Sequence, residues 1–90
     1  MYKARMGDVV MSTAGRDKGK TFLVIDICDG FAYIADGKVR KVLNCKKKNL
    51  KHLTKADEAS LKGDADKIKR GVPYGNERLN KTIKRAIQNK

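Results

Sequence analysis

Residues 20–28, KTFLVIDIC, form the most apolar stretch of this 90-residue chain. β-Branched and aromatic residues dominate the stretch, which favours a β-strand. Apart from Asp26, its apolar side chains fall on both faces of such a strand. We therefore expect this strand to lie in the middle of a sheet that is covered on both sides.

Two turn signals that follow this strand predict an antiparallel sheet. Asp29-Gly30 and Asp36-Gly37 are typical of tight hairpins, because both central positions of such turns favour a positive φ. The predicted strands are residues 7–13, 20–28, 31–35, 38–43 and a last short strand that holds Leu50 and Leu53. Five short strands within about fifty residues predict a mainly β fold, a small and strongly bent sheet or barrel.

The composition changes after Leu53. Thr54 has the residue type of a helix cap, and acidic residues follow it, so we predict a short helix over residues 55–61. Residues 63–75 contain the only proline and are predicted to be a linker. The predicted divisions are a barrel at residues 1–53, a short helix and linker at 54–75, and a basic C-terminal helix or flexible tail at 76–90.

A basic amphipathic helix is predicted from Asn76, which has the residue type of an N-cap. Its apolar residues, at helical spacing, are Leu79, Ile83, Ala86 and Ile87. Its opposite face carries Arg78, Lys81, Lys84 and Arg85. About twelve residues form a marginal helix in isolation. We therefore expect this helix to fray unless it docks on the rest of the protein.

Positive charge is concentrated in two parts of the chain, whose formal net charge is +12. Residues 1–36 are neutral overall, and residues 37–53 contain seven basic and no acidic side chains. Residues 54–66 are slightly acidic, and residues 67–90 contain eight basic side chains against Glu77 alone. Solubility does not require such clustering, whereas a phosphate-bearing partner favours it. The short chain, with one histidine and no tryptophan, predicts no enzyme.

The most specific local feature is the glycine loop, residues 15–20 (GRDKGK), between the first two predicted strands. Gly15 and Gly19 permit a turn with positive φ and leave the backbone uncovered, so that its N–H groups could approach a phosphate. Arg16, Lys18 and Lys20 surround that opening with positive charge. An ordinary hairpin with solvated lysines would have a similar sequence, so the loop alone leaves both interpretations open.

Residues 7–20 resemble a KOW motif, in which a strand, a basic glycine loop and the next strand belong to an SH3-like barrel. Residues 7–53 resemble the large-subunit ribosomal protein family called "fourteen-e" of archaea and eukaryotes. The matching pieces, in order, are TAGRDKGK at 13–20, VIDI at 24–27 and NLKHL at 49–53. The resemblance implies a KOW domain that binds ribosomal RNA, with Gly19 as the key glycine. The segment after Leu53, and in particular residues 68–90, matches nothing in that family, and the connection around Gly37 is shorter than the family's usual loop.

The resemblance and the charge pattern together predict which residues contact RNA. They are Gly15, Arg16, Lys18, Gly19, Lys20, Lys38, Arg40, Lys41, Lys46, Lys47, Lys48, Lys51, Lys69, Arg70, Arg78, Lys81, Lys84 and Arg85. Contacts to phosphates position an RNA and make binding sensitive to salt, but they carry no base information. Phe31 and Tyr33 share a strand face and are either core residues or a base-stacking pair; Tyr2 and Tyr74 are further stacking candidates.

No cofactor or metal is expected. Cys28 and Cys45 are 17 residues apart without a CxxC pair, so we interpret them as small buried hydrophobic residues. No apolar run is long enough to span a bilayer, and residues 1–8 lack the apolar stretch of a signal peptide. We therefore expect a soluble, cytoplasmic, ribosome-associated monomer, with large-subunit ribosomal RNA and neighbouring ribosomal proteins as partners.

Two other functions stay open at this point. SH3-like barrels also bind proteins, so a protein-interaction module of the translation or transcription machinery is the main alternative. The neutral residues 1–36 would then form the docking face. A basic amphipathic helix at 76–90 could also lie on an anionic membrane, although it has no aromatic anchor.

Overall fold

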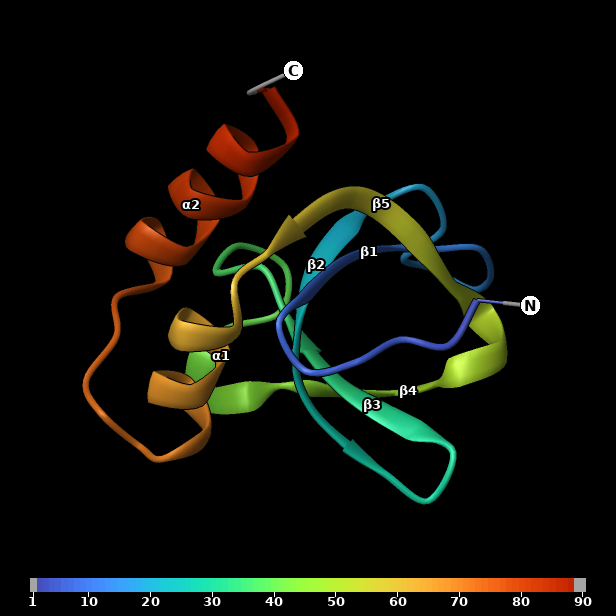
Figure 1. Cartoon of the computed structure of the whole chain (residues 1–90), viewed down its shortest axis with the longest axis horizontal. Helices are drawn as coiled ribbons and strands as arrows, with labels where there is room; N and C mark the ends of the chain where they lie inside the picture. Colours follow the sequence, from blue (N-terminus) through green and yellow to red (C-terminus); the bar gives the residue numbers. More distant parts are fainter. Residues whose placement is uncertain (1, 89–90) are drawn as a thin grey trace.

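The computed structural model describes residues 2–88, which form a mainly β, barrel-like domain with two helices on one side (Figure 1). The strands are β1 (Asp8–Ser12), β2 (Thr21–Cys28), β3 (Phe31–Ala35), β4 (Lys46–Asn49) and β5 (Leu53–Ser60). The helices are α1 (Lys62–Lys69) and α2 (Asn76–Gln88), and short 3-10 helices η1 (Val42–Asn44) and η2 (Leu50–His52) precede β4 and β5. The predicted antiparallel five-stranded architecture is confirmed.

The strand β2 lies at the centre of the sheet, whose order is β4-β3-β2-β1-β5. Leu23 pairs with Val9 of β1 on one side and with Ala35 of β3 on the other. Residues 22–25 are all buried, so both faces of β2 are covered. This confirms the expectation drawn from the apolar stretch at residues 20–28.

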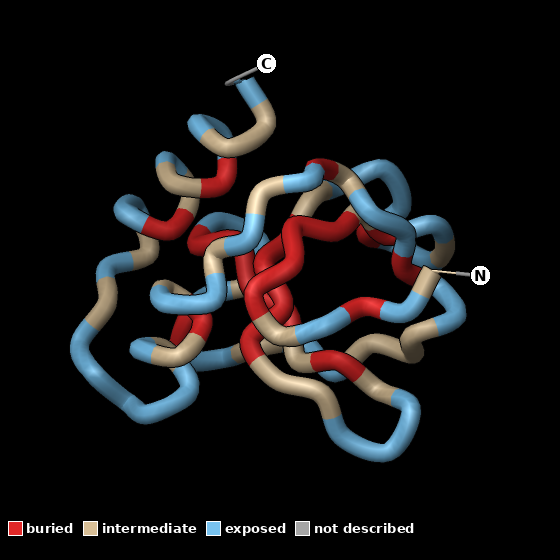
Figure 2. Tube along the Cα trace, in the orientation of Figure 1, coloured by how far each residue is buried: buried red, intermediate tan, exposed pale blue. Residues whose placement is uncertain are grey.

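Two hydrophobic clusters cover the two faces of the sheet. Figure 2 shows that the buried residues lie mainly along the strands, with a few on each helix. The barrel interior, which we call the inner cluster, contains Ala4, Val10, Phe22, Val24, Ala32, Ile34 and Leu53. The outer cluster contains Val9, Leu23, Ile25, Ala35 and Val42, together with Ala65 of α1 and Leu79 and Ile83 of α2. Alternate side chains of β2 enter the two clusters, because successive residues of a strand point to opposite faces. Both helices are therefore part of one folded unit.

The predicted strand at residues 38–43 is wrong. Asp36 turns this segment into a loop, because its Oδ1 accepts hydrogen bonds from the N–H groups of Lys38 (2.9 Å) and Arg40 (2.8 Å). The backbone N–H of Asp36 also donates to the carbonyl of Arg40 at 2.9 Å. The fourth strand lies further along the chain, at residues 46–49, and pairs with β3.

The predicted helix at residues 55–61 is also wrong, because residues 55–60 belong to β5 and Leu61 precedes α1. This strand pairs with β1 from Ser12–Leu53 to Asp8–Ser60, with irregular register between Asp8 and Val10. The predicted linker contains α1, which buries Ala65 in the outer cluster. This helix ends in a Schellman motif, in which the N–H groups of Gly71 and Val72 bond to carbonyls of the last turn.

The predicted C-terminal helix is confirmed and docks on the domain. Leu79 and Ile83 are 0 % and 3 % exposed. The side chain of Asn76 does not act as the expected cap: its Oδ1 accepts from the backbone N–H of Val42 at 2.8 Å. The apolar face of α2 is therefore covered by the domain. Residues 89 and 90 lie outside the described part of the chain.

Candidate nucleic-acid interface

The glycine loop connects β1 to β2 and is held by its own backbone. The N–H of Lys18 donates to Gly15 at 3.2 Å, that of Gly19 to Ser12 at 2.8 Å, and that of Lys20 to Asp17 at 2.9 Å. The expectation that these backbone donors are available to a phosphate is therefore wrong. Any contact from this part of the loop must come from side chains.

Those side chains point away from the core. Arg16, Lys18 and Lys20 are exposed, and none of them forms an ion pair with another residue of the described chain, 2–88. Gly19 has a φ of +85°, and no atom lies within 4 Å of where its Cβ would be. The loop therefore presents three cations around an uncovered backbone segment.

Arg40 has a structural role that the sequence did not reveal. Its Nε and Nη2 donate to Oδ2 of Asp17 at 3.2 and 2.9 Å. The Asp17 side chain is only 3 % exposed, so this carboxylate depends on Arg40 for its charge partner. The ion pair ties the glycine loop to the loop at residues 36–41. Among the predicted RNA contacts, Arg40 is thus already engaged within the protein.

The lysines of β4 lie on the edge of the sheet beside the glycine loop. Lys46 and Lys47 are exposed, and Lys47 Nζ lies 4.6 Å from the ring centre of Phe31. Lys48 is half-buried and donates from Nζ to the carbonyl of Ala14 at 2.9 Å. This bond brings β4 against the start of the glycine loop. Nearby in the chain, Lys41 and Lys51 are exposed and take part in none of the ion pairs found in residues 2–88.

The two aromatic residues of β3 differ in their surroundings. Tyr33 is half-buried and packs against the outer cluster, so it contributes to the core. Phe31 is half-buried at the start of β3, where the Lys47 ammonium lies over its ring. A base could stack on Phe31 only if Lys47 moved aside.

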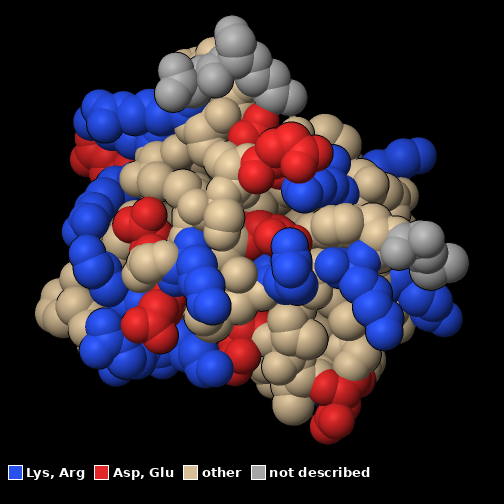
Figure 3. All heavy atoms as spheres, viewed as in Figure 1, with Lys and Arg blue, Asp and Glu red and all other residues tan. Residues whose placement is uncertain are grey.

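Much of the positive charge near the C-terminus is paired within the protein. Lys69 contacts Asp26 at 3.2 Å, Arg70 contacts Asp66 at 2.9 Å, Arg78 contacts Asp64 at 3.8 Å and Lys81 contacts Glu77 at 3.0 Å. Lys84 and Arg85 are exposed and have no ion-pair partner in the described chain. Figure 3 shows the two signs of charge side by side along the margin where the helices lie. Of the predicted contacts on α2, Lys84 and Arg85 are thus the unpaired cations.

Tyr74 contacts residues of both helices. Its hydroxyl donates to Oδ1 of Asp64 on α1 at 2.9 Å, and the guanidinium of Arg78 lies 4.4 Å from its ring centre. Burial raises the pKa of the Tyr74 phenol, and the hydrogen bond to Asp64 also raises it. Tyr2 is similarly engaged, because its hydroxyl donates to Asp8. Both predicted stacking residues therefore hold parts of the fold together.

A groove joins three of the predicted regions. It has a volume of about 400 Å³ and lies between the glycine loop, the loop at 36–39 and α2. Its lining residues are Gly19, Lys20, Thr21, Asp36, Lys38, Val39, Asn80 and Lys84. The fold thus brings Lys20, Lys38 and Lys84 to one place, although 64 positions separate the first from the last.

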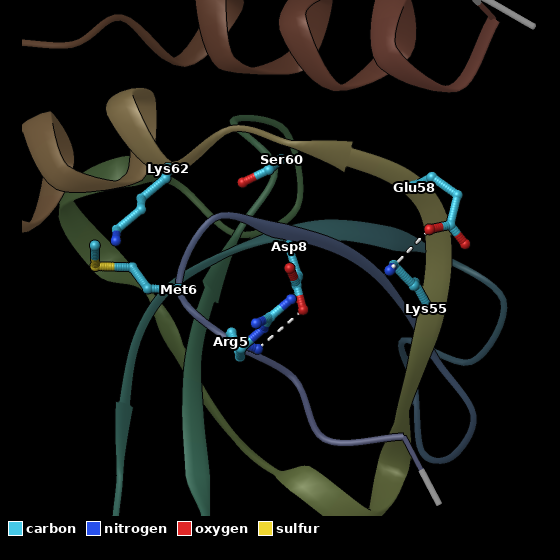
Figure 4. A pocket seen from close by; sticks show the side chains of 7 residues that line it. All are labelled: Arg5, Met6, Asp8, Lys55, Glu58, Ser60 and Lys62. Carbon is cyan, nitrogen blue, oxygen red and sulfur yellow. Dashed lines mark hydrogen bonds and ion pairs between the residues drawn. The ribbon is translucent and has the colours of Figure 1, made fainter.

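A second pocket, of about 310 Å³, lies between residues 5–8, β5 and the start of α1 (Figure 4). Sequence analysis did not identify it. Its charged lining is mixed: Asp8 accepts from the backbone N–H of Arg5 at 3.0 Å, and Glu58 pairs with Lys55 at 3.1 Å. Because charges of both signs line it, this pocket lacks the uniform positive potential that favours a phosphate.

The two cysteines lie in different environments. Cys28 is exposed, so its interpretation as a buried residue is wrong, whereas Cys45 is half-buried against the outer cluster. Burial raises the pKa of the Cys45 thiol, which keeps it protonated at neutral pH. Within residues 2–88, no three His, Cys, Asp or Glu side chains lie close enough together to hold a metal ion. None of the helices in these residues has the length and apolar character needed to cross a bilayer.

Comparison with known proteins gives no further guide to the site. No protein-family model matches the chain, and a search of curated proteins finds no significant match.

Proposed function

We propose that this protein is a non-catalytic RNA-binding protein of the KOW type, which acts on ribosomal RNA of the large subunit. Its binding surface consists of the glycine loop, the loop at residues 36–41, β4 and the adjoining η2. Contacts are made by lysine and arginine side chains to RNA phosphates. Recognition then depends mainly on the shape and phosphate positions of folded RNA.

The arrangement of the strands supports an SH3-like barrel. The strands β1 to β4 follow one another across the sheet, and β5 returns to pair with β1 after a 3-10 helix. The three pieces that resemble the ribosomal family occupy the β1–β2 connection, β2 and the β4–β5 connection. A KOW motif requires its basic glycine loop between two paired strands, which is where residues 15–20 lie.

The observation that carries the proposal is a set of unpaired cations around the glycine loop. In residues 2–88, the exposed cations of this surface without an ion-pair partner are Arg16, Lys18, Lys20, Lys38, Lys41, Lys46, Lys47 and Lys51. Neighbouring like charges repel one another, and an anionic ligand relieves that repulsion. A nucleic-acid backbone supplies phosphates spaced along such a surface.

Binding to RNA is tested by fluorescence anisotropy with the full chain and a labelled RNA hairpin. A DNA hairpin of the same sequence is the control ligand. We expect log K to fall linearly with log salt between about 50 and 200 mM, with a slope of magnitude at least about 3, because several phosphates release counterions. A flat salt response would overturn the proposal. Equal affinity for both hairpins would leave phosphate binding standing but remove the preference for RNA shape.

The ribosomal assignment needs a separate test. The native protein in a cell lysate is sedimented through a sucrose gradient at low and at high salt. Comigration with the large subunit at both salt concentrations is expected for a ribosomal protein, and comigration at low salt alone indicates a transient factor. Absence from all ribosomal fractions would overturn the assignment and favour another RNA or the protein-interaction alternative.

A further inference from the structure

The groove between the glycine loop and α2 carries an inference that the resemblance to KOW domains does not include. We propose that this groove is a phosphate-binding subsite in which α2 supplies Lys84 opposite Lys20 and Lys38. The ligand is a phosphate group, and its source is an RNA backbone, which rests on the proposed function. The helix is then part of the binding site.

The helix is held at the groove by polar contacts to the loop at residues 36–42. Asn76 Oδ1 accepts from the N–H of Val42 at 2.8 Å, and Asn80 Nδ2 donates to the carbonyl of Asp36 at 3.3 Å. Asn76, Asn80 and Lys84 are spaced four residues apart, so they follow one another along the same side of the helix. The two asparagines face the loop, and Lys84 continues their row into the groove.

Close packing fixes the distance between the helix and this loop. Gly37 has a φ of +78°, and a Cβ on it would lie 2.0 Å from the carbonyl oxygen of Asn76. Leu79 and Ile83, on the adjacent side of α2, are buried in the outer cluster. The position of Lys84 relative to Lys38 is therefore set by packed backbone and not by a mobile tail.

The glycine loop is also connected to the loop at residues 36–41. The Arg40–Asp17 ion pair connects it to the loop at 36–41, and Lys20 follows in the chain three residues after Asp17. The glycine loop, which forms the third wall of the groove, is thus held in place by this ion pair. The cations on all three walls belong to segments that are tied to one another before any ligand arrives, which lowers the cost of binding.

The charges in the groove favour an anion. Lys20, Lys38 and Lys84 are exposed, and none forms an ion pair within residues 2–88. The acidic residue in the lining is Asp36, whose Oδ1 already accepts from two backbone N–H groups. Three lysines against this one buried carboxylate leave an excess of positive charge. At the end of the groove, Gly19 has no side chain that would exclude a phosphate from the neighbouring lysines.

The test compares single-charge variants of the full chain in the RNA anisotropy assay. K84Q and K20Q each remove one groove cation, and K67Q removes an exposed cation of α1 that lies outside the predicted interface. We expect K84Q and K20Q each to weaken binding roughly tenfold and to lower the salt slope by about 1, with little change in K67Q. Because both lysines serve one phosphate, the double variant K20Q/K84Q should lower the slope by about 1 and not by 2.

Two results in this assay would overturn the inference while leaving the proposed function intact. In one, K84Q binds RNA as K67Q does. In the other, the double variant lowers the salt slope by about 2, which means that Lys20 and Lys84 contact separate phosphates.

A second measurement works without RNA binding. Inorganic pyrophosphate is titrated into the isotopically labelled protein, and amide shifts of Gly19, Lys38 and Asn80 are followed by NMR in the unmodified chain and in K84Q. Saturable shifts that K84Q weakens are expected. If they occur while the RNA hairpin does not bind, the groove stands as a phosphate site and the proposed function fails. Absence of saturable shifts together with an ineffective K84Q substitution overturns the groove.

Discussion

Two regions of this protein contain the same number of basic side chains in the sequence but differ in the folded structure. Residues 37–53 and 67–88 contain seven basic side chains each. In the first region only Arg40 forms an ion pair within the described chain. In the second, four of the seven do so: Lys69, Arg70, Arg78 and Lys81. The first region therefore presents the stronger positive potential to a ligand.

The difference arises from where the acidic residues lie. Asp66 and Glu77 pair with Arg70 and Lys81, each four residues further along the chain, and Asp64 of α1 pairs with Arg78 of α2. Asp26 projects from β2 toward Lys69 on α1. Within residues 2–88, the ion pair formed by the loop at 36–41 and β4 is the one between Arg40 and Asp17, and the Asp36 carboxylate accepts from backbone N–H groups of its own loop. Net charge counted along a chain thus overstates the ligand-facing charge of the helical region, because surface ion pairs reduce its local potential.

The largest effect is expected from Leu79→Ala, which tests whether the helical region is a docked part of the domain. Leu79 is fully buried in the outer cluster. Its truncation should lower the free energy of unfolding by about 2–5 kcal/mol, because a cavity replaces close packing. Urea unfolding followed by circular dichroism measures this change. The exposed Leu43, 98 % accessible, provides the matched control, and L43A should have almost no effect. Equal and small effects of both substitutions would contradict the docked position of α2.

Gly37→Ala should have the next largest effect on stability, because it disturbs the close contact between Gly37 and α2. The left-handed backbone costs about 1–2 kcal/mol for a residue with a Cβ, and crowding against Asn76 adds about 1–3 kcal/mol. Gly30 has a similar φ of +80° but open space around it, so G30A should show only the first cost. Comparing the two variants by thermal unfolding isolates the packing of α2. Should G30A be as destabilised as G37A, backbone strain alone would account for both.

The strands β1 to β3 and the helix α2 could be predicted because their patterns are local. The apolar run at 20–28, the Asp29-Gly30 turn and the helical spacing of Leu79 and Ile83 each specify structure over a few residues. The segment LTKADEAS at 53–60 carries cap-like and acidic residues that favour a helix. It becomes β5 because pairing with β1, more than 40 positions away, outweighs that local preference.

The candidate site could be predicted in composition but not in arrangement. The glycine loop and the clusters of basic residues were visible in the sequence. The partners of Arg40 and Lys69 were not, because Asp17 and Asp26 are 23 and 43 positions away. The seating of α2 beside Gly37 depends on tertiary packing, so the groove shared by Lys20, Lys38 and Lys84 had no signal in the spacing of those residues.

Arg40→Gln should have an intermediate effect and shows what the one ion pair of the first region contributes. It leaves the buried Asp17 carboxylate without its cation, while the partial exposure of Arg40 lets water reach the pair. We expect a loss of about 1–3 kcal/mol of unfolding free energy, the cost of an unsatisfied buried polar group. The double variant R40Q/D17N removes both charges and should recover part of this loss. If it recovers none, the ion pair is not the source of the effect.

The smallest change in stability and the clearest contrast in binding are expected from two matched pairs of substitutions. K41Q/K46Q removes two unpaired cations from the first region, and K69Q/K81Q removes two ion-paired cations from the second. Surface ion pairs contribute about 0–1 kcal/mol, so both variants should stay folded. In the RNA anisotropy assay, the first pair should lower the salt slope by about 2 and the second by clearly less, because the second region's lysines are already neutralised by carboxylates. Equal losses from both pairs would mean that ion pairing within the protein does not decide which cations meet the phosphates, and that RNA displaces Asp26 and Glu77 from their partners.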